Sequence, residues 1–176
     1  MFLGYVMKYL RVLSCAFLTT LFGCTSMPQG VEPVKNFELQ PYFGKWYEIA
    51  RLDHSFERGL TQVSAEYQPQ ADGGIAVINR GYSNEDQQWT QAEGKAYFVD
   101  AEDVGHLKVS FFGPFYSSYI VFEQGEDYAF ISGYNHDYLW LLARTPTVDS
   151  AIVERFKQVA SEKGFNVDQL IFVEQR

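Results

Sequence analysis

The chain has 176 residues, with 47% hydrophobic residues, 17% aromatic residues and a formal net charge of −8. This length suits a single domain with one sizeable core. The aromatic content favours β-strands and a lined cavity over disorder. Loss of residues 1–23 would remove Lys8 and Arg11 and leave a net charge of −10. Such a surface repels nucleic acid, so we expect no nucleic-acid partner.

Residues 1–23 have the pattern of a secretory signal peptide. Lys8 and Arg11 precede an apolar stretch from Val12 to Phe22, which is shorter than the roughly 20 residues that a membrane-spanning helix needs. A basic segment followed by a short apolar core is typical of a signal that is removed. Met1 and Met7 are both possible initiators.

Leu21-Phe22-Gly23-Cys24 resembles the lipobox of bacterial lipoproteins, in which the signal is cut before a cysteine that then carries acyl chains such as palmitate. The resemblance implies a lipid anchor on Cys24, and several acyl chains hold a protein stably where one does not. Thr25 follows the cysteine instead of Asp, which implies the outer membrane, facing the periplasm. The alternative is an ordinary signal peptide with an incidental cysteine. Since Cys15 leaves with the signal, we expect no disulfide in the mature chain.

Residues 24–36 contain Pro28, Gly30 and Pro33 and are predicted to be a tether between the lipid and a domain of residues 37–176. Within that domain, short alternating apolar runs separated by turn signals predict an all-β meander of antiparallel strands. The eight runs are 43–53, 61–70, 74–82, 88–99, 105–112, 116–124, 127–134 and 138–145.

The periodicity changes after Pro146. Ile152, Val153, Phe156, Val159 and Ala160 share one face at helical spacing. Asp149 is the expected N-cap and Gly164 the expected C-terminal glycine of this helix. A short final strand is predicted from Gln169 to Glu174.

Gly44, Trp46 and Tyr47 open the first strand, and Arg144 ends the eighth. This Gly-x-Trp-Tyr motif with a late arginine resembles the lipocalin family. The resemblance implies an eight-stranded antiparallel up-and-down barrel with the C-terminal helix packed outside. It also implies that Arg144 lies across the Trp46 ring and closes the barrel floor, a cation–π contact of about 0.5–2 kcal/mol.

Four further blocks resemble one branch of that family, the bacterial outer-membrane lipoprotein lipocalins and their apolipoprotein D relatives. They are Ala50-Arg51-Leu52-Asp53, Phe56-Glu57-Arg58-Gly59, Gly113-Pro114-Phe115-Tyr116 and Asp137-Tyr138-Leu139-Trp140. The branch often has Thr-Asp-Tyr before the eighth strand, where this chain has His136-Asp137-Tyr138.

Strand alternation predicts which side chains face the barrel interior, because charged residues must face water. Outward Glu66, Lys95 and Lys108 set the register of three strands, and Trp46 and Arg144 set that of the first and last. The resulting ligand-binding candidates are Glu48, Ala50, Tyr67, Phe98, Phe111, Tyr119 and Trp140. Small inward residues leave room for an acyl chain; the alternative is an interior filled by side chains.

A buried carboxylate needs a partner. If Glu48 faces inward, we expect it either to orient a polar headgroup or to pair with Arg80. The other interpretation places Glu48 near the solvated open end of the barrel. Residues 56–60 are expected to form the long first loop, the lid in lipocalins. The aromatic segment 112–116 lies between two strands. It is a candidate contact with a membrane or with a second copy in a homodimer, or a local cluster on the loop.

Signs of catalysis are weak. His54, His106 and His136 are isolated, without the short spacing that binds a metal from one element. Asp100, Glu102 and Asp103 are typical of a solvated turn. We therefore expect no metal, no cofactor and no enzymatic activity.

The resemblance and the lined interior together predict a lipid-anchored carrier that binds a fatty acid or lysophospholipid at the outer membrane, for storage or transfer during envelope maintenance or stress. Three alternatives stay open from the sequence: a carrier of another apolar ligand such as a tetrapyrrole or quinone, a lipid-modifying envelope enzyme, and a structural protein with a filled barrel.

Overall fold

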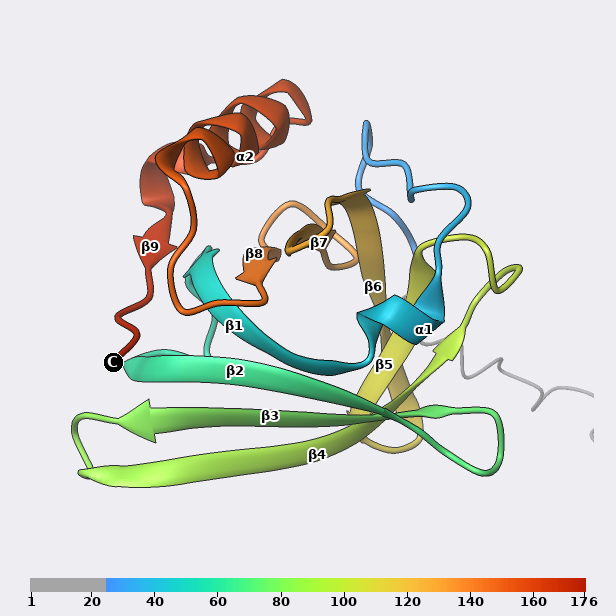
Figure 1. Ribbon diagram of the computed structural model, residues 1–176, viewed down its shortest axis with the longest axis horizontal. Coiled ribbons are helices and arrows are strands. Elements are labelled where there is room, and N and C mark those ends of the chain that lie inside the picture. The colour runs from blue at the N-terminus through green and yellow to red at the C-terminus, as the bar shows by residue number, and fades with distance from the viewer. Residues whose placement is uncertain (1–24) are drawn as a thin grey trace, which may run out of the picture.

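The computed structural model describes residues 25–176, so the predicted signal peptide and Cys24 lie outside the described residues. The described chain forms one antiparallel sheet closed into a barrel, with a helix on its outside (Figure 1). The strands are β1 (Gly44–Arg51), β2 (Leu60–Pro69), β3 (Ile75–Ser83), β4 (Gln88–Phe98), β5 (His106–Phe112), β6 (Phe115–Gln124), β7 (Tyr128–Ser132), β8 (Leu139–Ala143) and β9 (Ile171–Phe172). The helices are α1 (Leu39–Tyr42), α2 (Ser150–Glu162) and the 3₁₀ turn η2 (Val167–Gln169).

The predicted eight-stranded meander is confirmed. Strands β2 to β8 pair in sequence order, β8 pairs with β1, and β1 pairs with β2 to close the barrel. Closure leaves the eight barrel strands without an open sheet edge. Strands β7 and β8 are shorter than the runs 127–134 and 138–145 predicted for them.

Helix α2 begins and ends where the sequence predicts. The Asp149 carboxylate accepts a hydrogen bond from the Ala151 backbone N–H at 2.8 Å. Gly164, just beyond the helix, has a φ of 91°, which favours glycine. Phe156 is fully buried and meets Phe130 of β7 edge to face at 5.0 Å. The helix therefore packs on the outside of the barrel.

The final strand is shorter than the predicted range Gln169 to Glu174. Ile171 and Phe172 pair with β1, and the Val173 N–H donates to the Ile49 carbonyl at 2.9 Å, whereas residues 167–169 form the 3₁₀ turn η2. The rest of the tail still binds the barrel: the Gln62 N–H donates to the Glu174 carbonyl at 2.8 Å. Gln175 Nε2 donates to the carbonyls of Glu48 and Val63, so the tail bridges β1 and β2 where these strands diverge.

Residues 25–36 are packed along the barrel and are not a free tether. Val31 is only 4% exposed and joins the core between the barrel and α2. The Val34 N–H donates to the Val121 carbonyl of β6 at 2.9 Å, and Lys35 forms a bridge with Val104. Backbone bonding and the buried residues Pro28 and Val31 hold the segment against the sheet.

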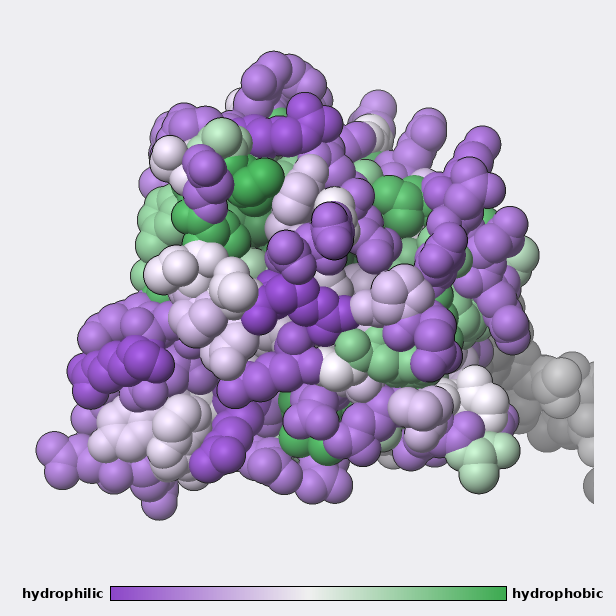
Figure 2. Space-filling view, in the orientation of Figure 1, coloured by the Kyte–Doolittle hydropathy of each residue, from purple (hydrophilic) through white to green (hydrophobic). Residues whose placement is uncertain are grey.

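The outer surface is mostly hydrophilic on the side drawn in Figure 2, with hydrophobic side chains gathered beside α2 and β9. Ile171 and Phe172 are both more than one-third exposed there. No helix within residues 25–176 is both long and apolar enough to cross a bilayer.

Candidate ligand-binding site

The barrel contains a cavity of about 740 Å³, within the usual range for small-molecule sites. Its walls are largely apolar and include Val63, Ala65, Val77, Ala96, Leu107 and Val109. The loops between β1 and β2 and between β7 and β8, and the tip of the β5–β6 hairpin, contribute residues at its open end. The interior is therefore not filled by side chains.

Most of the predicted ligand-binding residues line this cavity. They are Glu48, Tyr67, Phe111, Tyr119 and Trp140. Outward Glu66 and Lys108 account for the direction of Tyr67 and Phe111, and the parity of Trp46 and Arg144 accounts for that of Glu48 and Trp140.

Ala50 and Phe98 lie elsewhere, so their predicted positions on the cavity wall are wrong. A bulge between Glu48 and Ala50 shifts the β1 register and turns Ala50 into the core beneath α2. Phe98 packs against Phe37 near the closed end, ring centroids 6.1 Å apart. The predicted inward direction of Phe98 on β4 is correct, but Phe37 of the N-terminal segment covers its side chain.

The closed end is built on Trp46. The Arg144 guanidinium lies 3.8 Å from the centre of the indole ring and donates hydrogen bonds to the carbonyls of Lys45 and Pro41. The Trp46 N–H donates to the Tyr42 carbonyl at 2.8 Å. Gly44 has a φ of 91°, which a side chain there would disfavour. These contacts seal the floor as expected.

Three tyrosine hydroxyls meet just above the floor. Tyr119 lies 2.7 Å from both Tyr42 and Tyr67, hydroxyl to hydroxyl. Burial raises the pKa of all three, so the hydroxyls stay neutral. This cluster could not be predicted as a unit from the sequence, because its members come from α1, β2 and β6. Inward parity at Tyr67 and Tyr119 was the only signal for it.

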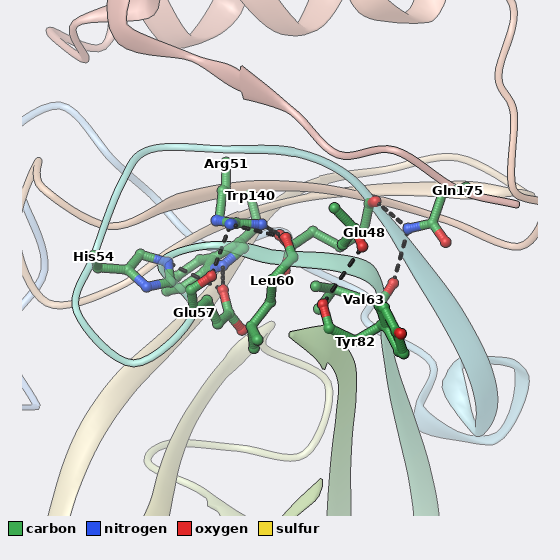
Figure 3. A network of polar contacts seen from close by, with 10 residues as sticks. Glu48, Arg51, His54, Glu57, Leu60, Val63, Tyr82, Trp140 and Gln175 are labelled. Carbon is green, nitrogen blue, oxygen red and sulfur yellow. Dashed lines mark hydrogen bonds and ion pairs between the residues drawn. The ribbon is translucent and has the colours of Figure 1, made fainter. Parts of the chain in front are cut away.

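A polar network lies in the cavity wall between β1 and the first loop (Figure 3). Arg51 donates to the Glu48 carboxylate at 2.6 Å and to the Glu57 carbonyl at 2.8 Å. The Trp140 indole N–H donates to the Glu57 carboxylate at 3.1 Å. The predicted partner of Glu48, Arg80, instead lies 4.4 Å from the Trp89 ring.

His54 completes this network. Its Nε2 lies 3.2 Å from the Glu57 carboxylate without hydrogen-bond geometry, and the ring is 6% exposed. Phe56 stacks on it with ring centroids 4.1 Å apart. Apart from the Ala50–Asp53 and Phe56–Gly59 blocks, no pattern in the residues predicted this grouping.

Burial controls the charges of the network. Burial raises the pKa of Glu48, the nearby Glu57 raises it further, and Arg51 opposes both. Burial likewise raises the pKa of Glu57. Burial and the Arg51 charge lower the pKa of His54 to about 4, so the ring is neutral at pH 7.

Three phenylalanines at the open end are exposed to solvent. Phe56, Phe112 and Phe115 are 58%, 83% and 69% exposed, and each also lines the cavity. The first loop thus reaches over the cavity, as the lid interpretation expects, and segment 112–116 presents its rings outward at a hairpin tip. Exposed apolar groups around a cavity mark an interaction surface.

One Ser–His–Asp arrangement occurs on β5 and β6. His106 Nε2 lies 3.1 Å from Ser118 Oγ, and Nδ1 lies 3.3 Å from Asp100 Oδ2. Ser118 is 3% exposed and His106 is 2% exposed. Among residues 25–176, no three His, Cys, Asp or Glu side chains are grouped so as to hold a metal ion.

Known proteins resemble this chain along nearly its whole length. Outer membrane lipoprotein Blc of Vibrio cholerae is 56% identical over 173 residues, which cover 97% of this chain and all of that protein. The Blc lipoprotein of Escherichia coli K12 is 46% identical, covering 92% of this chain and 93% of its own length. Apolipoprotein D of mouse is a more distant match.

A solved structure, insecticyanin from the tobacco hornworm, has the same fold: the TM-score is 0.68 at 20% identity, over 86% of this chain and 87% of that one. The family described as a lipocalin-like domain matches residues 37–175. The Trp46–Arg144 floor, the closed eight-stranded barrel and these matches agree, and the chain belongs to the lipocalin family.

Proposed function

We propose that this lipocalin binds one fatty acid or lysophospholipid in its barrel and stores or transfers it at the outer membrane. The observation that carries the proposal is the cavity of about 740 Å³ with apolar walls and one open end. Each methylene that leaves water contributes about 0.8 kcal/mol, so an acyl chain gains affinity in proportion to its buried length. Binding is reversible partition between bilayer and barrel, and we expect no turnover.

The proposed location is the periplasmic face of the outer membrane, held by acyl chains on Cys24. The relatives named outer membrane lipoprotein match from near the N-terminus, which supports this location. The substitution Cys24→Ser should release the protein from membranes into the soluble fraction. Continued membrane retention of that variant would contradict the anchor.

Filling the cavity tests the binding proposal. Ala65 lies on the cavity wall, whereas its neighbour Glu66 points to the outer face of the same strand. Ala65→Phe should weaken binding of a fluorescent fatty acid roughly tenfold, because its ring displaces about two methylenes. The matched control Glu66→Phe adds the same ring outside and should bind normally. Equal binding by both variants would contradict a ligand in this cavity.

A second candidate function, hydrolysis of a lipid ester, draws on the Ser118–His106–Asp100 arrangement. In that role His106 would take the Ser118 proton and Asp100 would orient the imidazole. We favour binding because the Ser118 hydroxyl is already paired with the buried His106, on the face of β6 that it shares with outward Lys108, its cross-strand neighbour. Release of fatty acid from a lysophospholipid that disappears in Ser118→Ala would establish the enzyme instead.

A further inference from the structure

We propose that the tyrosine cluster at the cavity floor, formed by Tyr42, Tyr67 and Tyr119, binds a neutral oxygen atom at the buried end of the ligand. The barrel would then select acyl chains that carry a hydroxyl group at the end far from the carboxylate. This site deepens the proposed function and rests on it, because an acyl chain must first enter the barrel by its tail.

The tyrosine cluster has one more hydroxyl proton than its hydrogen bonds use. The Tyr119 hydroxyl oxygen lies 2.7 Å from those of Tyr42 and Tyr67, and these are the only two hydrogen bonds that the three hydroxyls make within residues 25–176. Each neutral hydroxyl donates one proton, so three protons serve two bonds. Whichever hydroxyl donates in each pair, one O–H proton is left without an acceptor in the protein.

That proton belongs to a polar spot in apolar surroundings. All three tyrosines line the cavity, and Tyr42 and Tyr67 are buried. Val77 lies opposite Tyr67 on β3, and Leu107 lies opposite Tyr119 on β5. The methyl end of a plain acyl chain would leave the proton unpaired away from bulk water, which lowers affinity by roughly 5- to 150-fold for a buried donor. An oxygen atom on the chain end would remove that cost.

The floor suits a neutral oxygen better than a carboxylate. Burial raises the pKa of all three tyrosines, because a negative charge is poorly solvated there. The basic residues that line the cavity are Arg58 on the first loop and Arg80 on β3, both in the half of the barrel nearer the open end. The Arg144 guanidinium is engaged with the Trp46 ring and with two backbone carbonyls.

A hydroxyl group matches the tyrosine cluster in both directions. Its oxygen accepts the unpaired tyrosine proton, and its own proton is donated to a free lone pair of a tyrosine oxygen. The charged head of the same molecule stays towards the open end, where the basic residues of the cavity lie. The ligand class is therefore a fatty acid or lysophospholipid with an ω-hydroxylated chain.

Hydroxy fatty acids test the site in the acylated protein, held in lipid vesicles. Palmitic acid and its ω-hydroxy and α-hydroxy derivatives are compared by displacement of a fluorescent fatty acid. Lauric and myristic acids with their ω-hydroxy derivatives extend the series, because the depth of the cavity selects the chain whose end reaches the floor. Partition into the vesicles is the same for every protein variant, so it cancels when affinity ratios are compared between variants.

The test variant is the triple substitution Tyr42→Phe, Tyr67→Phe and Tyr119→Phe, which keeps each ring and removes every hydroxyl of the tyrosine cluster. A single substitution would still leave at least one unpaired proton. The matched control is Tyr97→Phe, which removes a hydroxyl bonded to Asp72 outside the cavity.

In the natural protein, we expect the ω-hydroxy acid to bind at least as tightly as its parent acid at the chain length that reaches the floor. In the triple variant it should bind about tenfold more weakly than the parent, because its hydroxyl loses water and gains no partner. Tyr97→Phe should keep the natural ratio. The α-hydroxy acid, whose hydroxyl lies beside the carboxylate, should give one ratio in all three proteins.

An unchanged ratio of ω-hydroxy to parent affinity in the natural and triple-variant proteins, at every chain length, would overturn the proposal. A water molecule retained on the tyrosines would give that result. Saturable binding of the parent acids with such an unchanged ratio refutes only the site at the floor, whereas the absence of saturable binding of any acid refutes the proposed function.

A second measurement applies if the triple variant does not fold. The natural protein is loaded with ω-hydroxy acid that is isotope-labelled at its terminal methylene, and NMR cross-peaks locate that group. We expect cross-peaks with the rings of Tyr67 and Tyr119. Cross-peaks confined to residues of the open end, such as Phe56 and Tyr138, would overturn the proposal.

Discussion

The closed and open ends of the barrel are held together by different kinds of interaction. At the closed end, Arg144 covers Trp46 and three neutral tyrosines share hydrogen bonds. At the open end, a buried network of charged and titratable groups lies beneath exposed phenylalanines. The motif that identifies the family therefore lies at the closed floor, whereas the buried charges and the exposed aromatic rings lie where the cavity opens.

The largest expected effect is at the open end. Arg51→Ala should lower the free energy of unfolding by about 3–5 kcal/mol, because Glu48 and Glu57 lose the buried cation between them. Urea unfolding measures the change. The matched control is Arg58→Ala, which removes an exposed ion pair with Asp53 and should cost no more than about 1 kcal/mol. Similar losses in both variants would show that the network does not support the open end.

Acid should weaken the same network through His54. Its pKa is about 4 in the folded chain against 6.5 as a free side chain, so the unfolded chain binds more protons between these values. Stability should therefore fall as the pH drops from 6.5 to 4, by about 3 kcal/mol from this group. The raised pKa values of Glu48 and Glu57 act with the opposite sign, since they cost stability as the pH rises.

The variant His54→Phe isolates the histidine contribution while keeping an aromatic ring beside Phe56. The difference in unfolding free energy between this variant and the natural chain should be steady above pH 6.5 and should favour the variant increasingly below it. Two results would refute a buried, neutral His54 ring: a difference in unfolding free energy that does not change with pH, or an NMR titration of His54 itself near pH 6.5.

A smaller effect is expected at the closed end. Arg144→Ala removes the contact with Trp46 and two backbone hydrogen bonds, and should lower stability by about 2 kcal/mol. Fatty-acid affinity should change less than the melting temperature, because Arg144 seals the floor from outside. Arg155→Ala, which breaks the exposed ion pair with Glu123, serves as the control. A large loss of affinity with unchanged stability would place Arg144 in the binding site.

The sequence predicted the closed end better than the open end, for physical reasons. Gly44, Trp46 and Arg144 follow from strand order and a motif, and strict alternation correctly turned Tyr67 and Tyr119 inward. Alternation fails at a bulge, and the bulge after Glu48 sent Ala50 to the opposite face.

Glu48 pairs with Arg51 and not with Arg80, one of the alternatives left open from the sequence, for a related reason. Arg51 is three residues away on the same strand, a spacing that regular alternation would send to the opposite face. The bulge brings the two side chains together, and a loop carries Glu57 and His54 back to them. The periodicity of apolar residues in the sequence predicts neither the bulge nor the path of the loop.

Native mass spectrometry of the protein purified from envelope membranes tests the central claim most directly. The account predicts one bound molecule per chain, with the mass of a fatty acid or lysophospholipid, and its loss from Ala65→Phe but not from Glu66→Phe. A bound mass that matches a tetrapyrrole or a quinone would contradict the lipid ligand, and a chain that never carries a ligand would contradict the carrier.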